Sequence, residues 1–395
     1  MKRIWICLLS LALAISGIFT LPGQASDAGD IGNDSAPTTS TDYGFSVDAK
    51  GAILMEATTG TVLYEQNASA AYPPASVTKI MTLLLVMEAV DSGKIALTDR
   101  VPVSEYAASM GGSQVFLEAG EEMTVEEMIK CTVISSANDA AVALAEFVSG
   151  SESAFVGEMN ARAAALGMKN SSFENVTGLD DTTQNHVTSA EDIAIMSRAL
   201  IAHPLILKYS SIWMDTIRDG TFTLTNTNRL VRYYQGATGL KTGSTAKAKF
   251  CISVTATRGN MTLIAVIMGS PTRDVRNDAA RKLLDYGFAN YALFEAEGRE
   301  MDGVRVMGGV SDSCTVKHEG FSFVVKKGEL NSVESVYELP KHLIAPLGVG
   351  AEVGKVSYRI GERELGCVPI KVDEAISKIT FWKLFGRICE RIFFS

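Results

Sequence analysis

Histidine and cysteine are scarce in this 395-residue sequence, and basic residues are fewer than acidic ones. It contains four histidines and six cysteines, with no C-x-x-C pair and no H-E-x-x-H segment. Because zinc and thiol redox centres normally need such groupings, the sequence predicts no metal site. The formal net charge of −9 argues against nucleic-acid binding, which requires a basic surface.

The cysteines are few enough to consider one by one. Cys131 and Cys251 lie in apolar stretches, which is typical of unreactive core residues. Cys314 and Cys367 are candidates for a disulfide if the chain reaches an oxidising compartment.

A long apolar run stands at the N-terminus, from Ile4 to Leu21, behind two basic residues. Gly23 and Ala25 then supply the small residues that signal peptidase requires. This pattern predicts a cleaved signal peptide over residues 1–25, and a retained membrane anchor stays open as the alternative. In either case we expect the chain to be exported.

Residues 26–44 are rich in Ser, Thr, Asp, Gly and Pro, which predicts a disordered leader. Apolar runs around turns predict one hairpin over residues 52–64 and another over 250–268. Apolar periodicity predicts helices over Ser76–Val90, Val125–Ile134, Asp139–Val148, Ser153–Leu166, Ser189–Ala202 and Arg273–Tyr291. Strands at both ends with helices between them predict an α+β domain over residues 45–294, in which one antiparallel sheet packs against a helical block.

The chain changes character after Phe294. Residues 301–372 contain short β-like runs that Gly, Lys-Lys-Gly and Pro turns separate. We therefore predict a small all-β domain over residues 295–373.

Ser76 and Lys79 form the first candidate site. The prolines before them allow a helix to begin here, and positions i and i+3 share one helix face, so the ammonium would lie beside the hydroxyl. A serine becomes a good nucleophile only when a base removes its proton, and a buried lysine is able to act as that base. Ser244 and Lys247 have the same spacing, so this motif alone also fits a pair of surface residues.

The second candidate is Ser136-Ala137-Asn138, in a short polar break between two apolar helices. Taken alone, this motif favours helix capping over catalysis. The third candidate is Lys241-Thr242-Gly243, followed by Ser244, at the start of a late strand. A glycine there lets another segment approach the backbone, although an ordinary hairpin turn fits this segment too.

The three motifs together are those of penicillin-recognising serine enzymes, in the same order. The sequence thus resembles the low-molecular-mass penicillin-binding proteins that act as D-alanyl-D-alanine carboxypeptidases. Further segments carry the resemblance: residues 72–76, 170–179, 186–192 and 226–230. Two positions depart from many members, since Ala137 stands where glycine is common and Ser244 where a larger residue is common.

The resemblance implies a role for each motif residue. Ser76 would form the acyl-enzyme, Lys79 would be its general base, and Ser136 would relay a proton. Asn138 would hold Lys79 and the peptide backbone, and Lys241 and Thr242 of the Lys241-Thr242-Gly243 segment would bind the terminal carboxylate. The backbone N–H groups of Ser76 and Ser244 would form the oxyanion hole. His186 and Asp139 would be structural, and no cofactor would be needed.

The resemblance also implies the partners and leaves rivals open. Peptidoglycan stem peptides would be the substrate and β-lactams the inhibitors, with no role for nucleic acid. A β-lactamase is the nearest alternative, but no Glu-x-x-Leu-Asn segment precedes Lys241, and Glu174-Asn175 fits poorly. An endopeptidase or transpeptidase on the same fold stays open, and so does a non-catalytic wall-binding scaffold.

The residue pattern of the tail, residues 374–395, predicts an amphipathic helix. Lys383, Arg387 and Arg391 follow one face at steps of four, and Phe381, Trp382, Phe385, Ile388, Cys389 and Ile392 point the other way. Too much charge interrupts it to span a bilayer, so we predict that it lies on the membrane surface. A helix packed on the chain's own β domain is the alternative.

Overall fold

A computed structural model describes residues 43–393 of the chain. The predicted signal peptide and all but the end of the predicted leader lie outside the described residues.

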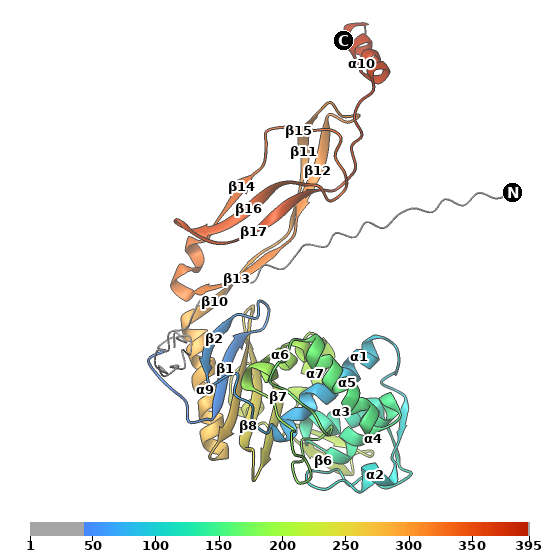
Figure 1. Ribbon diagram of the computed structural model, residues 1–395, viewed down its shortest axis with the longest axis vertical. Coiled ribbons are helices and arrows are strands. Elements are labelled where there is room, and N and C mark those ends of the chain that lie inside the picture. The colour runs from blue at the N-terminus through green and yellow to red at the C-terminus, as the bar shows by residue number, and fades with distance from the viewer. Residues whose placement is uncertain (1–42, 394–395) are drawn as a thin grey trace, which may run out of the picture. The chain divides into compact units, whose positions relative to one another are not determined.

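A five-stranded antiparallel sheet forms the centre of the first domain (Figure 1). Its strand order is β2-β1-β9-β8-β7. The strands are β1 (Gly51–Glu56), β2 (Val62–Gln66), β7 (Ala237–Thr245), β8 (Lys249–Arg258) and β9 (Met261–Ser270). Both predicted hairpins are therefore present, and pairing of β1 with β9 closes the sheet between distant parts of the chain.

Helices cover the two faces of this sheet. Helix α9 (Arg273–Asn290) packs on β8 and β9, and Figure 1 shows the helical block on the other side. That block contains α1 (Lys79–Asp91), α2 (Glu105–Ala108), α3 (Val125–Ile134), α4 (Asn138–Ser149), α5 (Glu152–Ala165), α6 (Ala190–Ile201) and α7 (Pro204–Ser210). The predicted α+β fold class is confirmed.

Helix α1 is the central element of the block. Ten of its thirteen residues are buried, so its apolar side chains are removed from water almost all the way round. The predicted helix over Ser76–Val90 is corrected at its start, where Ala75–Thr78 forms a 3₁₀ turn, η1, ahead of α1. A 3₁₀ turn often opens a helix and places its side chains differently from an α-helical turn.

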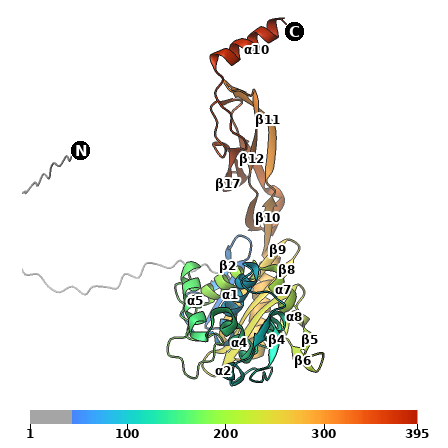
Figure 2. The same cartoon turned by 90° about the vertical axis from the view of Figure 1, so that its right-hand side faces the viewer.

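Several short elements were not predicted because each is too short for a periodic pattern. They are β3 (Arg100–Pro102), β4 (Glu122–Thr124), β5 (Met214–Ile217), β6 (Phe222–Thr225) and α8 (Leu230–Tyr233). Figure 2 shows α8 beside the β5–β6 hairpin, where Trp213 and Tyr233 make an edge-to-face contact.

The second domain is all-β, as predicted. Strand β10 (Tyr291–Ala296) pairs with β13 (Phe321–Lys326) and straddles the predicted boundary at residues 294 and 295. A six-stranded sheet follows, with the order β14-β16-β17-β12-β11-β15. Its strands are β11 (Arg299–Met307), β12 (Ser313–His318), β14 (Glu334–Glu338), β15 (Leu343–Ile344), β16 (Glu352–Ile360) and β17 (Arg363–Val372), with the 3₁₀ turn η2 (Lys327–Ser332) after β13.

Two further predictions for this region are corrected. Cys314 is buried in the β-domain core and Cys367 is exposed, and both are free thiols. The tail helix, α10 (Phe381–Phe393), begins seven residues later than predicted. The reason is that Ile376 and Lys378 form β-bridges with the β domain, and Ile376 is buried in its core.

Candidate active site

Ser76 lies in η1, and Lys79 is the first residue of α1. The Lys79 Nζ atom lies 3.1 Å from Ser76 Oγ, 2.5 Å from Asn138 Oδ1 and 2.8 Å from the Thr177 carbonyl oxygen. Burial lowers the pKa of Lys79 well below its usual value, nearby Lys241 lowers it further, and Asp139 opposes both. A buried lysine with a lowered pKa, beside a serine hydroxyl, is the arrangement that a general base needs.

A buried hydrogen-bond chain holds the nucleophile turn in place. The N–H of Glu174 donates to His186 Nδ1 at 3.0 Å, so the proton of the neutral imidazole is on Nε2. That nitrogen lies 2.8 Å from Thr78 Oγ1, which in turn donates to the Ala75 carbonyl at 2.9 Å. Burial lowers the pKa of His186 to about 4, so the ring is neutral near pH 7.

The backbone of this turn is strained. Ala75 has φ +51°, a left-handed conformation that is unfavourable for a residue with a Cβ. Gly178 packs against it, and a Cβ on this glycine would lie 1.9 Å from the Ala75 carbonyl oxygen. The loop that carries Gly178 and Thr177 therefore fits one conformation of the nucleophile turn.

Ser136 and Asn138 lie at the junction of α3 and α4. Both are buried, and Ser136 has φ +64°. Asn138 links Lys79 to the opposite wall, because its Nδ2 donates to the Gly111 carbonyl at 2.7 Å. The Asp139 carboxylate accepts the N–H groups of Val115 and Leu117, each at 3.1 Å, which is a structural role.

Strand β7 supplies the third side of the site. Lys241 is buried, and its Nζ donates to Ser136 Oγ at 2.8 Å and to the Thr242 carbonyl at 2.9 Å. Burial, and then the charge of Arg276, lower the pKa of Lys241 to about 7. The Thr242 hydroxyl donates to Thr227 Oγ1 at 2.8 Å.

Gly243 lets this strand approach the nucleophile turn. A Cβ at this position would lie 2.8 Å from the Ser76 nitrogen and 2.8 Å from the Pro74 carbonyl oxygen. The next residue, Ser244, is exposed and lines the pocket, and Lys247 is exposed near the end of the β7–β8 turn. Among described residues no hydrogen bond joins Ser244 to Lys247, so this second Ser-x-x-Lys match lacks the geometry that Ser76 and Lys79 have.

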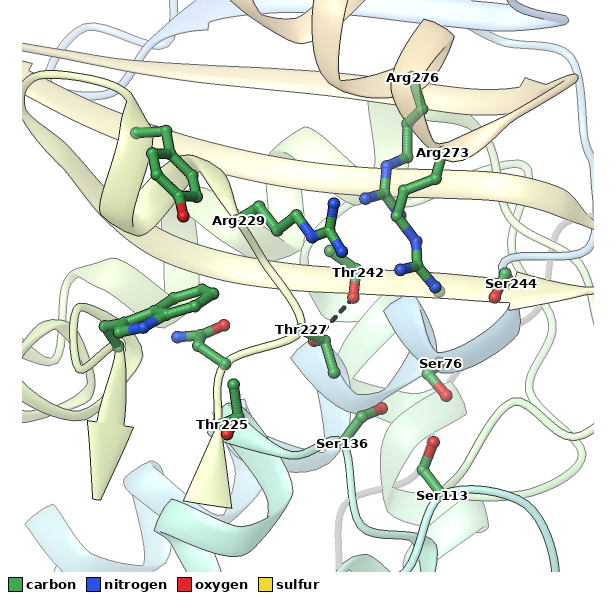
Figure 3. Close-up of a pocket in the computed structure, with 14 residues that line it drawn as sticks. Ser76, Ser113, Ser136, Thr225, Thr227, Arg229, Thr242, Ser244, Arg273 and Arg276 are labelled. Atoms are coloured by element: carbon green, nitrogen blue, oxygen red, sulfur yellow. Dashed lines mark hydrogen bonds between the residues drawn. The ribbon is translucent and has the colours of Figure 1, made fainter. Parts of the chain in front are cut away.

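A pocket of about 660 Å³ opens onto Ser76 (Figure 3). Its lining combines predicted residues with others that the sequence analysis did not single out: Ser76, Ser113, Ser136, Trp213, Thr225, Asn226, Thr227, Arg229, Tyr233, Thr242, Gly243, Ser244, Arg273 and Arg276. Lys79, Asn138 and Lys241 lie buried behind this surface.

Three arginines are the main feature that the sequence analysis missed. Arg229 follows the Asn226-Thr227-Asn228 segment, and Arg273 and Arg276 lie in the first turn of α9. A signal existed for Arg229, which lies inside a segment already noted. Arg273 and Arg276 lie in a predicted helix in which the sequence analysis found no sign of a functional site.

Comparisons with known proteins agree with this geometry. Residues 35–272 match the family described as D-alanyl-D-alanine carboxypeptidase, and residues 296–378 match the C-terminal domain of penicillin-binding protein 5. D-alanyl-D-alanine carboxypeptidase DacF of Bacillus subtilis is 44% identical over 85% of this chain and 88% of its own length. DacC of Escherichia coli is 34% identical over 87% of each chain.

Solved structures give the same result. Penicillin-binding protein 5 from Haemophilus influenzae superposes with a TM-score of 0.74 at 33% identity, covering 84% of this chain and 98% of the other. Penicillin-binding protein D2 from Listeria monocytogenes, solved in an ampicillin-bound form, has a TM-score of 0.54 at 32% identity over 62% of this chain and 98% of its own. Sequence, fold and site together place this chain in the D-alanyl-D-alanine carboxypeptidase family.

Proposed function

We propose that this chain removes the terminal D-Ala from peptidoglycan stem peptides through an acyl-enzyme on Ser76. The observation that carries the proposal is the buried Lys79 amine, 3.1 Å from the Ser76 hydroxyl. Lys79 takes the hydroxyl proton, and Ser76 Oγ attacks the carbonyl carbon of the penultimate D-Ala.

The rest of the cycle uses the neighbouring groups. The oxyanion faces the backbone N–H groups of Ser76 and Ser244. The C–N bond to the last residue breaks, and its nitrogen receives the proton that Lys79 took from Ser76, relayed through Ser136, which hydrogen-bonds Lys241. Lys79 is then neutral again. Water attacks the ester, Lys79 accepts a proton from this water and passes it to Ser76 Oγ, and the Ser76 hydroxyl is restored.

Lys241 and Thr242 are the proposed partners of the terminal carboxylate. The Thr242 hydroxyl is at the pocket surface. Lys241 contributes its positive charge from behind the pocket surface, since its Nζ already contacts Ser136 Oγ and the Thr242 carbonyl oxygen. A proton shared between this lysine and the Ser136 hydroxyl also suits its lowered pKa of about 7.

β-Lactams are the proposed inhibitors, and they would acylate the same Ser76 oxygen. The ampicillin-bound form of the Listeria protein supports this, as a relative on the same fold. A β-lactamase is less favoured, because the residues that line the pocket include no glutamate to activate a deacylating water. The Glu174 carboxylate instead accepts the N–H groups of Gln184 and Asn185.

Two measurements test the activity. A stem peptide ending in D-Ala-D-Ala should lose one D-Ala, and benzylpenicillin should add one covalent mass to the peptide that contains Ser76. Ser76→Ala should abolish both, and Ser244→Ala should still be acylated. An adduct on Ser244, or rapid penicillin turnover without D-Ala release, would contradict the proposal.

We also propose an exported enzyme made of a signal peptide (residues 1–25), a leader (26–44), the peptidase domain (45–294), the β domain (295–373) and a surface-bound tail (374–395). Within residues 43–393 no helix is long and apolar enough to cross a bilayer. Helix α10 nevertheless exposes a set of large apolar side chains: Phe381, Trp382, Leu384, Phe385, Ile388, Ile392 and Phe393. Such a face suits a helix lying in the membrane interface.

The alternative for the tail has some support as well. Arg387 hydrogen-bonds the Asp312 carboxylate at 2.8 Å and the Val310 carbonyl, so one basic residue of α10 contacts the β domain. Because this contact leaves the apolar side chains exposed, we favour the membrane surface. The full chain should sediment with anionic vesicles, and Phe381→Ser/Phe385→Ser should release it. Equal sedimentation of both proteins would contradict surface binding.

A further inference from the structure

The active-site pocket is strongly positive on one wall. Arg229, Arg273 and Arg276 all line it, and no aspartate or glutamate is among its lining residues. Figure 3 shows the three guanidinium groups pointing into the same space, around the strand that carries Thr242. Their proximity also affects titration: burial, Arg273 and Arg229 lower the pKa of Arg276 to about 10, against the opposing effects of Cys251 and Asp274.

Arg276 is the buried arginine of this wall, and the protein holds its side chain in place. It is 3% exposed, and its protein partners are the Asn277 side-chain oxygen at 2.8 Å and the Cys251 carbonyl at 3.3 Å. Neither partner is an acid. A buried guanidinium without a carboxylate is costly, which makes it a group that an incoming anion would stabilise.

Arg229 and Arg273 are exposed, and neither side chain has a hydrogen bond or an ion pair with a described residue. Two acids, Asp274 and Asp278, line an adjoining groove that shares Arg229 with the pocket; Asp278 pairs there with Arg281 at 3.0 Å, and Asp274 is exposed. No hydrogen bond or ion pair with a described residue therefore holds either pocket arginine away from a ligand.

The wall extends past the proposed site of the terminal carboxylate. Thr242 hydrogen-bonds Thr227, and Thr225 and Trp213 continue the lining on that side. The Trp213 Nε1 donor is buried and has no acceptor among described residues. The terminal carboxylate is part of the leaving residue. We therefore take the pocket space next to that carboxylate as available to the side chain of the leaving residue, and not to the acyl part of the peptide.

The number of charges exceeds what one carboxylate uses. A carboxylate has two oxygens, and a bidentate pair with one arginine already occupies both. A second guanidinium is able to share them, but a third is left with its charge uncompensated. D-Ala supplies one carboxylate and a methyl side chain, so it leaves this part of the pocket unused.

We propose that the pocket takes a leaving residue with two carboxylates, so that the enzyme also cleaves stems ending in D-Ala followed by an acidic D-amino acid. This rests on the proposed function and uses the same step. Ser76 Oγ forms the ester, the C–N bond breaks, and the leaving nitrogen gains the proton, whereas the second carboxylate pairs with Arg229 and Arg273.

The test compares three acyl-peptides that differ only in the last residue: D-Ala, D-Glu and its neutral isostere D-Gln. Release of each free D-amino acid by the full chain is measured by mass spectrometry to give kcat/KM. We expect D-Glu to exceed D-Gln by about tenfold, the size of one charge-assisted contact at a partly exposed site. Raising the ionic strength should reduce this ratio, because salt screens exposed charges.

Single variants locate the effect. Arg273→Gln and Arg229→Gln should each bring the D-Glu to D-Gln ratio toward one, whereas Arg100→Gln, an exposed arginine paired with Glu122 outside the pocket, should leave it unchanged. Equal rates for D-Glu and D-Gln in the wild-type enzyme, or a ratio that survives both variants, would overturn the inference while D-Ala release stands. Failure to release any D-amino acid would instead overturn the proposed function.

Discussion

The buried polar groups of the catalytic motifs differ in their partners from two buried polar groups of the β domain. In the peptidase domain, Lys79, Asn138 and Lys241 are all buried, and each makes hydrogen bonds that connect it to another part of the site. In the β domain, His318 Nε2 and Ser357 Oγ are buried and have no partner among described residues. Satisfied networks fix side-chain positions, so the motif residues are held accurately. Outside the motifs, the peptidase domain also contains a buried donor without an acceptor among described residues, Trp213 Nε1.

Three glycines illustrate two different uses of this residue. Gly178 and Gly243 are needed because a Cβ would collide with the nucleophile turn. In the β domain, Gly361 has φ +58° in a hairpin turn, and a Cβ there would meet nothing within 4 Å. The two glycines at the active site serve close approach, and Gly361 serves turn conformation.

The largest difference between the domains should appear on removing a lysine. Lys79→Met should lower D-Ala release and penicillin acylation by about 10⁴-fold or more, because the nucleophile loses its base. The fold should survive, since Met fills the space without a buried charge. Lys355→Met, at a partly exposed β-domain lysine paired with Glu338 at 3.4 Å, is the matched control and should change neither rate. Acylation of Lys79→Met at the wild-type rate would show that another group is the base.

Adding one methyl group to a glycine should give the next largest difference. Gly178→Ala should lower the free energy of unfolding by about 3 kcal/mol or more, from the left-handed backbone and the clash with Ala75, and should reduce kcat. Gly361→Ala should cost about 1 kcal/mol and leave kcat unchanged. Urea unfolding and D-Ala release of both variants check this, and equal losses of kcat would remove the distinction between the domains.

A smaller effect is expected from pH. His186 has a pKa lowered from 6.5 to about 4, so between these values the unfolded chain binds a proton that the folded chain does not. The titration of His186 therefore leaves the free energy of unfolding at its full value above pH 6.5 and lowers it as pH falls toward 4, by about 3 kcal/mol at most. The free energy of unfolding of His186→Gln should therefore depend less on pH in this window, and exposed His342→Gln should behave as wild type. Identical pH profiles for His186→Gln and wild type would contradict this.

The smallest effect should be on an unpartnered hydroxyl. Ser357→Ala removes a buried oxygen without a hydrogen bond and should raise the free energy of unfolding by up to about 1 kcal/mol, with kcat/KM unchanged. Ser136→Ala, whose hydroxyl accepts from Lys241, should instead reduce kcat/KM by about 10²-fold or more. A destabilised Ser357→Ala would mean that this hydroxyl does have a partner.

Sequence patterns located most of the long elements and the motif residues. Periodicity works for α3, whose predicted and observed bounds agree, because one apolar face repeats along it. Periodicity predicted the wrong helix start at η1 and in the tail before Phe381, because long-range contacts outweigh the local helix propensity in both places. Ala75 takes a left-handed conformation against Gly178, and Ile376 is drawn into the β-domain core.

The sequence by itself determined the α+β and all-β domains and the three motifs, since these depend on apolar patterns and short spacings along the chain. Only the tertiary structure decided which partners those motifs meet. Lys241 lies 2.8 Å from Ser136, 105 residues away, and Lys79 bonds the Thr177 carbonyl, 98 residues away. It also brought Arg229 from one loop and Arg273 and Arg276 from helix α9 to a single pocket. No local rule predicts such meetings, because packing of the whole sheet against its helices fixes them.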